Sequence, residues 1–299
     1  MAFPFPSPSS WHITRDLDLF LDRAGPFLRS EPAAHTVQLS VTDAVRTRGA
    51  QAYGDEAPYF AWFTDPEGAV RATALRTPPF PLQLTDTTPD AADALAGRLA
   101  EAGETDETLP GVGGPAEATA EFAAAWERRT GAVGRLVMRQ RLYRLGTLTV
   151  PEPAPPGKAR VATAEDLGVV ARWYDAFLTE AGEPAREDPE KWAGTRIAYG
   201  GITLWELPDG TPAAMAGATP PIAGQVRVMS VYTPVALRRR GYAGAATAEV
   251  SRAALATDAG EVLLFTDLAN PTSNGLYQRI GYRPVQDFAT YTFTPRAAG

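Results

Sequence analysis

Residues 237–244 read L-R-R-R-G-Y-A-G, between an apolar stretch that suits a strand and an alanine-rich stretch that suits a helix. The spacing R-x-x-G-x-A places Arg238, Gly241 and Ala243 where the helix would begin. Backbone N–H groups in the first turn of a helix have no partner within it, and the helix dipole favours negative charge there. Gly241 and Gly244 leave those amides uncovered, and the arginines add positive charge. The stretch therefore predicts a binding site for a phosphate-bearing ligand.

A second motif follows another apolar stretch, and residues 270–282 read N-P-T-S-N-G-L-Y-Q-R-I-G-Y. The two motifs in this order resemble those of the GNAT superfamily of acyl-CoA-dependent N-acyltransferases, in which the first motif holds the pyrophosphate of acetyl-CoA. The second family motif, N-x-x-(A/S)-x-x-x-Y-x-x-x-G-(F/Y), falls here on Asn270, Ser273, Tyr277, Gly281 and Tyr282. The letters V-Y-T-P before the first motif are most similar to the glycine N-acyltransferase-like branch. The resemblance covers residues 158–295 well and the first half of the chain only weakly.

The resemblance implies that acetyl-CoA is the co-substrate and that no metal takes part. Backbone groups at the end of the strand before the loop would pair with the pantetheine arm as another strand would. In the family, two central strands separate there and make room for the thioester. The residues expected to contact acetyl-CoA are Val231, Tyr232, Thr233, Arg238, Arg239, Arg240, Gly241, Tyr242, Ala243, Gly244, Asn270, Ser273, Asn274 and Tyr277.

Tyr277 is the expected general acid. By resemblance it lies near the thioester sulfur, and a phenol is protonated at neutral pH. The alternative is a packed aromatic ring whose hydroxyl is only structural. The N–H of Val231 would donate to the oxyanion. The side chain of Asn270 would either reach the pantetheine arm or only cap a helix.

The general base is less well defined by the sequence. Many relatives carry a glutamate on the strand before the loop, whereas this strand reads Q-V-R-V-M-S-V. The remaining possibilities are Asp267, Glu180 or Glu183, or a chain of water molecules without a dedicated base. Residues 180–188 are acidic and lie where the family forms its acceptor cleft, which favours a cationic amine as acceptor.

The composition excludes several classes of protein. The 299 residues include no cysteine and two histidines, which excludes disulfide frameworks, a cysteine nucleophile and a multi-histidine metal centre. A net charge of −7 argues against general nucleic-acid binding. No stretch reaches the ~18 apolar residues of a membrane helix, and the N-terminus lacks the basic region of a signal peptide. We therefore expect a cytoplasmic protein, and the scarcity of lysine beside arginine indicates a GC-rich bacterial genome.

The domain organisation is predicted from a proline-rich stretch and an internal echo. Residues 151–157, P-E-P-A-P-P-G, suit a linker between a domain at 1–150 and another at 158–299. Residues 62–79 and 204–221 both read as a hairpin that ends in Thr-Pro-Pro, at an offset of 142. The predicted fold class is α/β, with two tandem GNAT-like domains, each a mixed, mostly antiparallel sheet flanked by helices.

The first half is predicted to be degenerate, because the same offset places residues 96–102, A-G-R-L-A-E-A, against the phosphate loop. That stretch has helical character and no glycine loop. Residues 111–116 form a G-x-G-x-x-A pattern, but Pro115 lacks an N–H, so a loop before a helix at 116–128 is expected. Residues 139–145 would end this domain as a strand or a helix.

In the second half, apolar periodicity and caps predict the order of elements. Asn270 suits an N-cap, Pro271 the first helical position and Gly281 the left-handed C′ position. Strands are predicted at 160–162, 202–206, 212–218, 225–233, 262–267 and 288–294, and helices at 165–181, 192–199, from 242 onward, and at 271–280.

These patterns together predict an acetyl-CoA-dependent N-acetyltransferase. The acceptor would be a small-molecule amine, a peptide N-terminus or a lysine, the protein a monomer or homodimer, and neither nucleic acid nor a membrane would be a partner. The alternative is a non-catalytic acyl-CoA-binding regulatory protein. Retention of Tyr277 favours the enzyme, and the missing strand glutamate keeps the alternative open.

Overall fold

The computed structural model describes residues 10–103, 109–182, 188–257 and 259–295. The chain divides into two compact units, of which unit 1 comprises Met1–Arg141 and Gln286–Gly299, and unit 2 comprises Leu142–Val285. This division differs from the predicted boundary at 151–157, which lies inside unit 2. The reason is that two long strands, β6 (Val133–Leu145) and β12 (Tyr282–Thr294), each have residues in both units.

Unit 1 contains a mixed sheet in the order β1-β2-β3-β4-β5-β12-β6. Its pairs β1–β2, β2–β3, β3–β4 and β5–β12 are antiparallel, and β4–β5 is parallel. Besides β6 and β12, its elements are β1 (Ser10–Thr14), α1 (Leu17–Ser30), α2 (Thr36–Arg48), β2 (Tyr59–Thr64), β3 (Val70–Arg76), β4 (Leu82–Leu84), α3 (Pro89–Glu101), β5 (Gly111–Pro115) and α4 (Ala116–Thr130).

Strand β2 shows why both faces of this sheet carry helices. Alternate side chains of a strand point to opposite faces. Phe60 and Trp62 contact Phe20 of α1, with the ring centroids of Phe20 and Phe60 5.2 Å apart. Tyr59 and Ala61 belong instead to the core that contains residues of α3 and α4. The strand is therefore apolar at successive positions because it is buried on both sides.

Unit 2 contains a sheet in the order β6-β11-β10-β9-β8-β7. The β10–β11 pair is parallel, and β7–β8, β8–β9 and β9–β10 are antiparallel. Its elements are β7 (Lys158–Val161), η1 (Ala164–Asp166), α5 (Leu167–Ala181), α6 (Pro189–Ala198), β8 (Ile202–Glu206), β9 (Pro212–Ala218), β10 (Gln225–Tyr232), η2 (Val235–Leu237), α7 (Tyr242–Leu255), β11 (Glu261–Asp267) and α8 (Pro271–Ile280).

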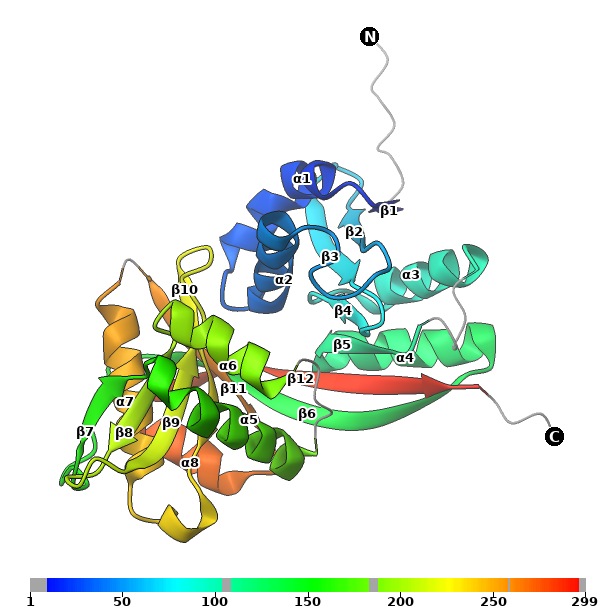
Figure 1. Cartoon of the computed structure of the whole chain (residues 1–299). Helices are drawn as coiled ribbons and strands as arrows, with labels where there is room; N and C mark the ends of the chain where they lie inside the picture. Colours follow the sequence, from blue (N-terminus) through cyan, green and yellow to red (C-terminus); the bar gives the residue numbers. More distant parts are fainter. Residues whose placement is uncertain (1–9, 104–108, 183–187, 258, 296–299) are drawn as a thin grey trace. The chain divides into compact units, whose positions relative to one another are not determined.

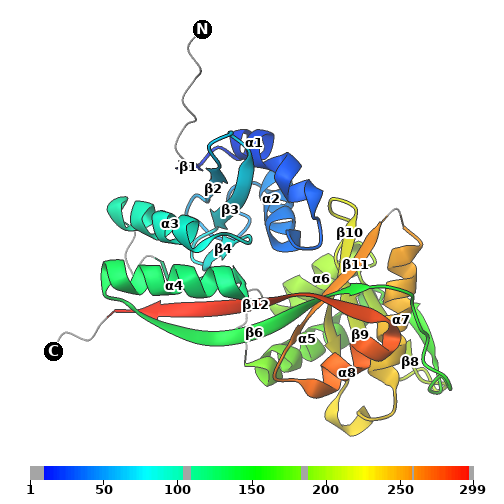
Figure 2. The same cartoon turned by 180° about the vertical axis from the view of Figure 1, so that it is seen from behind.

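Helices cover both faces of the unit 2 sheet as well. Figure 1 shows α5 and α6 on one face, and Figure 2 shows α7 and α8 on the other. Two separate apolar cores correspond to the two faces, one with residues of α5 and α6, the other with residues of α7 and α8. The predicted fold class, with a mixed and mostly antiparallel sheet flanked by helices in each half, is confirmed.

Helices and strands follow one another in the same order in the two units. The similar hairpins that the sequence predicted occupy equivalent places in this order. Hairpins β2–β3 and β8–β9 each have a register irregularity beside the turn, at Thr64 and Glu206. Gly68 and Gly210 occupy the turns with nearly equal φ values of +84° and +86°, which favour glycine. Both hairpins therefore use the same turn geometry.

One local prediction for unit 1 was wrong. Residues 111–115, expected to be a loop, form strand β5, which pairs with β4 and β12. The glycines make this possible, since a Cβ on Gly111 would lie 2.1 Å from the carbonyl oxygen of Tyr291 and one on Gly114 would lie 2.6 Å from that of Leu84. Glycine is required at these two positions because the neighbouring backbones leave no room for a side chain, whereas Val112 between them is buried in the core.

Candidate functional site

The end of β10 changes conformation next to the predicted site. Ser230 has a φ of +49°, and the register with β9 shifts between Met229 and Tyr232. The parallel register of β10 with β11 runs only from Gln225 to Val228. A bulge bends a strand and leaves its backbone locally unpaired. This geometry agrees with the expected separation of the two central strands.

The loop after β10 ends at a helix start without a side-chain cap. Gly241 is the N-cap of α7, its φ is +86°, and it has no side-chain oxygen that could accept a hydrogen bond from the first turn. The N–H of Ala245 already donates to the Gly241 carbonyl. The N–H groups before it have no carbonyl within the helix to which they could donate. The start of α7 thus keeps N–H groups for a ligand, and the dipole favours an anion there.

Gly244 has a packing role besides the one expected. A Cβ on it would lie 3.0 Å from Leu276 Cδ1 and 3.7 Å from Pro151 Cγ. Its missing side chain therefore lets α7 approach α8 and the residues before β7. Because Leu276 precedes Tyr277, this contact also joins the phosphate loop to the helix that carries the expected acid.

The proline-rich residues 151–157 form part of the wall of this site. Pro155 is buried, and its ring atoms lie 3.7–3.9 Å from the position that a Cβ on Gly241 would take. The indole Nε1 of Trp205 donates to the carbonyl oxygen of Pro156 at 3.0 Å. The expected linker is thus packed on unit 2 beside the helix start.

The three arginines of the loop differ in their contacts. Arg238 Nε donates to the Thr233 carbonyl at 2.9 Å, and its Nη2 donates to Glu180 Oε2 at 2.5 Å. Arg239 and Arg240 are exposed and have no hydrogen-bond or ion-pair partner among the described residues. The side-chain hydroxyl of Thr233 is buried and has no hydrogen-bond partner among the described residues. A polar group of a ligand would supply that hydrogen bond.

Tyr277 lies on α8 and is 8% exposed. Its ring centroid lies 6.1 Å from that of Tyr282 in an edge-on arrangement. Tyr282 shares a hydrogen bond of 2.7 Å with Ser251, whereas the Tyr277 hydroxyl has no partner within the described chain. Burial raises the pKa of Tyr277 to about 12, so the hydroxyl holds its proton throughout the neutral range.

The polar residues at the start of α8 are engaged in structure. Asn270 Oδ1 accepts from the Ser273 N–H at 3.0 Å and caps the helix. Asn274 Nδ2 donates to the carbonyl oxygens of Asp267 and Asn270, and Asn274 Oδ1 accepts from the hydroxyl of Tyr143 at 2.9 Å. These hydrogen bonds account for the presence of Asn270 and Asn274 at these positions without a contact to a ligand. Tyr143 comes from β6, far away in sequence, and no local signal identified it.

Neither described carboxylate candidate for the base has a contact with Tyr277. Asp267 is exposed, and its Oδ1 accepts from the Ala269 N–H at 2.8 Å. Glu180 accepts from Arg238 and from the Tyr232 hydroxyl, the latter at 3.1 Å. Glu183 lies outside the described residues. Both placed carboxylates are therefore acceptors for groups of the chain itself.

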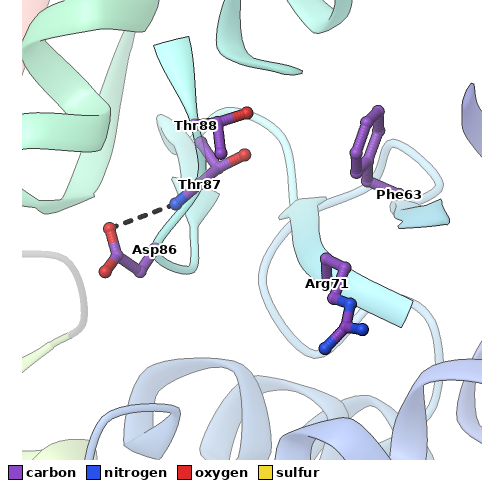
Figure 3. A pocket seen from close by; sticks show the side chains of 5 residues that line it. All are labelled: Phe63, Arg71, Asp86, Thr87 and Thr88. Carbon is purple, nitrogen blue, oxygen red and sulfur yellow. Dashed lines mark hydrogen bonds between the residues drawn. The ribbon is translucent and has the colours of Figure 1, made fainter. Parts of the chain in front are cut away.

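Unit 1 has its counterpart of the phosphate loop at a place that the sequence offset missed. Residues 96–102 are helical as expected, but they lie within and just after α3. The counterpart of the start of α7 is the start of α3, where a small pocket is lined by Phe63, Arg71, Asp86, Thr87 and Thr88. Figure 3 shows these side chains, with the Asp86 carboxylate accepting from the Thr87 N–H at 3.1 Å.

The start of α3 is closed to an anion, unlike that of α7. Thr88 caps α3 by accepting from the Ala91 N–H at 3.3 Å, and Pro89 removes another donor. Asp86 adds negative charge, and Arg71 is paired with Asp65 at 2.6 Å. Strands β4 and β5 also stay close together, because Gly114 lets the carbonyl of Leu84 approach.

Among the described residues, no helix combines the length and apolar character needed to span a bilayer. The same residues include no group of three or more His, Cys, Asp or Glu arranged to hold a metal ion.

Residues 212–291 match the family model of FR47-like proteins, a range that contains the phosphate loop and Tyr277. No curated protein matches the chain.

Several solved structures are similar to it. The GCN5-related N-acetyltransferase from Sphaerobacter thermophilus is 18% identical over 94% of this chain and 95% of that chain, with a TM-score of 0.60. A GNAT-family acetyltransferase from Colwellia psychrerythraea is 10% identical over 95% and 100%, with a TM-score of 0.59. The GCN5-related N-acetyltransferase from Kribbella flavida is 20% identical over 76% and 87%, with a TM-score of 0.52. Identities this low show a shared fold.

Proposed function

We propose that this chain, which has the fold of the GCN5-related N-acetyltransferases, transfers an acetyl group from acetyl-CoA to a primary amine. The observation that carries the proposal is the uncapped start of α7, which is joined through Gly244 and Leu276 to the helix that carries Tyr277. One element offers amides to a diphosphate, and the other holds a protonated phenol close to it. The acceptor is a small-molecule amine, a peptide N-terminus or a lysine.

The residues of the site fit acetyl-CoA as a co-substrate. The amides at the start of α7 suit the phosphates, as do Arg239 and Arg240, which have no partner among the described residues. The register of β10 with β11 ends at Val228, which leaves the backbone of Val231 on that side for the pantetheine arm. Within the described chain the buried Thr233 hydroxyl lacks a partner that a ligand could supply. Bound there, acetyl-CoA supplies an activated acyl carbon and a thiolate leaving group.

The chain would assist the transfer mainly through Tyr277 and Val231. The amine nitrogen forms a bond to the acyl carbon, the carbon–sulfur bond breaks, and the thiolate takes the proton of the Tyr277 hydroxyl. The N–H of Val231 donates to the developing oxyanion. Both oxygens of Glu180 accept hydrogen bonds from the chain, so the proton lost by the amine passes to water, and the Tyr277 phenolate takes a proton back from water.

One observation favours the alternative function, an acyl-CoA-binding regulatory protein without turnover. Strand β10 carries no carboxylate, and the described candidates for the base accept hydrogen bonds from the chain itself. Release of free thiol separates the two functions. An enzyme releases CoA from acetyl-CoA in the presence of an accepted amine, whereas a sensor only binds it.

The test combines a turnover screen with a melting measurement. Acetyl-CoA should raise the Tm of the wild-type chain, since a ligand that binds only the native state stabilises it, and amines, amino acids, aminoglycosides and peptides are screened for thiol release. Gly241→Glu should abolish the Tm shift by placing a carboxylate against the diphosphate. Gly210→Glu is the matched control, because that glycine has the same φ of +86° and open space around it. If acetyl-CoA still raises the Tm of the Gly241→Glu variant, the phosphates bind elsewhere.

A further inference from the structure

Arg238, the first arginine of the loop, is held by three groups of its own unit. Besides its bonds to the Thr233 carbonyl and to Glu180, its guanidinium carbon lies 5.7 Å from the centre of the Tyr232 ring. The Tyr232 hydroxyl donates to the other oxygen of Glu180 at 3.1 Å. Both oxygens of this carboxylate are therefore used, and the positive charge of Arg238 is balanced.

This cluster joins two elements that the site requires. Glu180 lies in the last turn of α5, whereas Tyr232 ends β10 and Thr233 follows it. Burial, and secondly the bond to Glu180, raise the pKa of Tyr232, so its hydroxyl remains a donor at neutral pH. The side chains of Arg238 and Glu180 are each 41% exposed, so their ion pair contributes little to the stability of the fold. The cluster acts mainly by fixing the positions of α5, the end of β10 and the loop.

The next two arginines contrast with Arg238. Arg239 and Arg240 are exposed and lack partners among the described residues. Arg239 also has a φ of +63°, a left-handed conformation that residues other than glycine adopt at a cost, and that clusters at functional sites.

We infer that Arg238 is a positioning residue, neutralised by Glu180 and fixing the end of β10, and that, of the three loop arginines, Arg239 and Arg240 supply the free charge for the phosphates. The inference rests on the proposed function, since it assigns roles within that site. It also removes Glu180 from the candidates for the base and makes it a second positioning residue.

The test is calorimetric titration of CoA into the full-length chain at about 0.1 M and about 1 M NaCl, between which the Debye length falls from about 10 Å to about 3 Å. In the Arg239→Gln and Arg240→Gln variants, affinity should fall several-fold at low salt and depend less on salt than in the wild type. The double variant Arg238→Gln/Glu180→Gln, which removes both charges of the pair, should keep the wild-type salt dependence. Glu180→Gln should strengthen it, because it releases the charge of Arg238. Asp175→Asn, an exposed acid on the same helix, should change nothing.

A second measurement does not depend on CoA. If Arg238 and Glu180 act together, Arg238→Gln and Glu180→Gln should each lower the Tm, and the double variant should lower it no further than one of them. Additive Tm losses, or an Arg238→Gln/Glu180→Gln double variant whose salt dependence weakens as much as that of Arg239→Gln, would overturn the inference. A wild-type chain that binds no CoA at all would overturn the proposed function instead, while the Tm comparison would still decide whether the two residues act as a pair.

Discussion

Tyr277 combines burial, a lone hydroxyl and a motif position that points to acid catalysis. Its hydroxyl has no partner within the described residues, so a structural role for the hydroxyl has little support, although the ring packs on Tyr282.

The Tyr277→Phe variant should lower turnover by roughly 10² to 10⁴, because only the proton donor is removed. The affinity for CoA should stay close to that of the wild type, since the ring packing is kept. The measurements are thiol release with an accepted amine and calorimetry with CoA. Tyr282→Phe is the control, and it should lose stability through its bond to Ser251 while keeping turnover. An unchanged rate in Tyr277→Phe would assign the residue to packing.

The same residue predicts a pH effect on stability. The folded-state pKa of about 12 lies above the ordinary value of 10, so the neutral form is favoured by folding. The resulting stability is complete below pH 10 and is lost as the pH rises towards 12. Urea unfolding at pH 8 and above pH 10 should show a smaller alkaline loss in Tyr277→Phe than in the wild type, by up to about 3 kcal/mol. Equal losses in both proteins would contradict the buried, neutral hydroxyl.

At the scale of elements, a variant at the start of α8 can distinguish the two roles considered for Asn270, capping the helix and contacting the pantetheine arm. Asn270 caps the helix through the Ser273 N–H. The Asn270→Ala variant should therefore lower the free energy of unfolding by about 1 kcal/mol. If capping is its whole role, the affinity for CoA stays unchanged, which calorimetry measures. A marked loss of affinity at unchanged stability would show that the side chain reaches the pantetheine arm.

Elements with local signals could be predicted from the sequence, and those that depend on distant backbone could not. Helix α8 has the predicted bounds, because Asn270, Pro271 and Gly281 define its two ends within the segment. The sequence did not predict strand β5, because its glycines are required by the close approach of the backbones of Tyr291 and Leu84, which lie far away in sequence. No pattern in residues 111–115 reveals those neighbours.

The candidate site shows the same division. The phosphate loop and Tyr277 follow from motifs of fixed spacing, whereas the partners that decide what each residue does come from other elements. Glu180 reaches Arg238 from α5, and Tyr143 reaches Asn274 from β6. The counterpart loop of unit 1 was misplaced, because the offset that holds at the hairpins does not continue to the start of α3.

For the whole molecule, the two helix starts lead to a prediction of stoichiometry. The start of α7 is uncapped, whereas that of α3 is capped by Thr88 and flanked by Asp86. One CoA per chain should therefore bind, and calorimetry on the full-length protein should give a ratio near one. Gly241→Glu should reduce the ratio to zero rather than reveal a residual site. Two equivalent sites in the wild type would contradict the account of unit 1.

The composition of the units also decides where the chain can be cut. A fragment that begins at residue 150 lacks Tyr143 and the other β6 residues that belong to unit 2. It would lose the bond from Tyr143 to Asn274, so weak CoA binding by that fragment would not distinguish the loss of unit 1 from damage to unit 2.

Strand β12 has a consequence for how the protein is made. Its residues Phe288 to Thr292 pair with β5, and Phe293 packs against Trp126 in the core of unit 1. Domains usually fold on the ribosome in the order of synthesis, the N-terminal one first. Here the N-terminal unit is completed by a strand that is translated after all of unit 2, so it stays incomplete while unit 2 is being synthesised. A stop codon just before the codon of Gln286 would thus damage the unit whose synthesis began first.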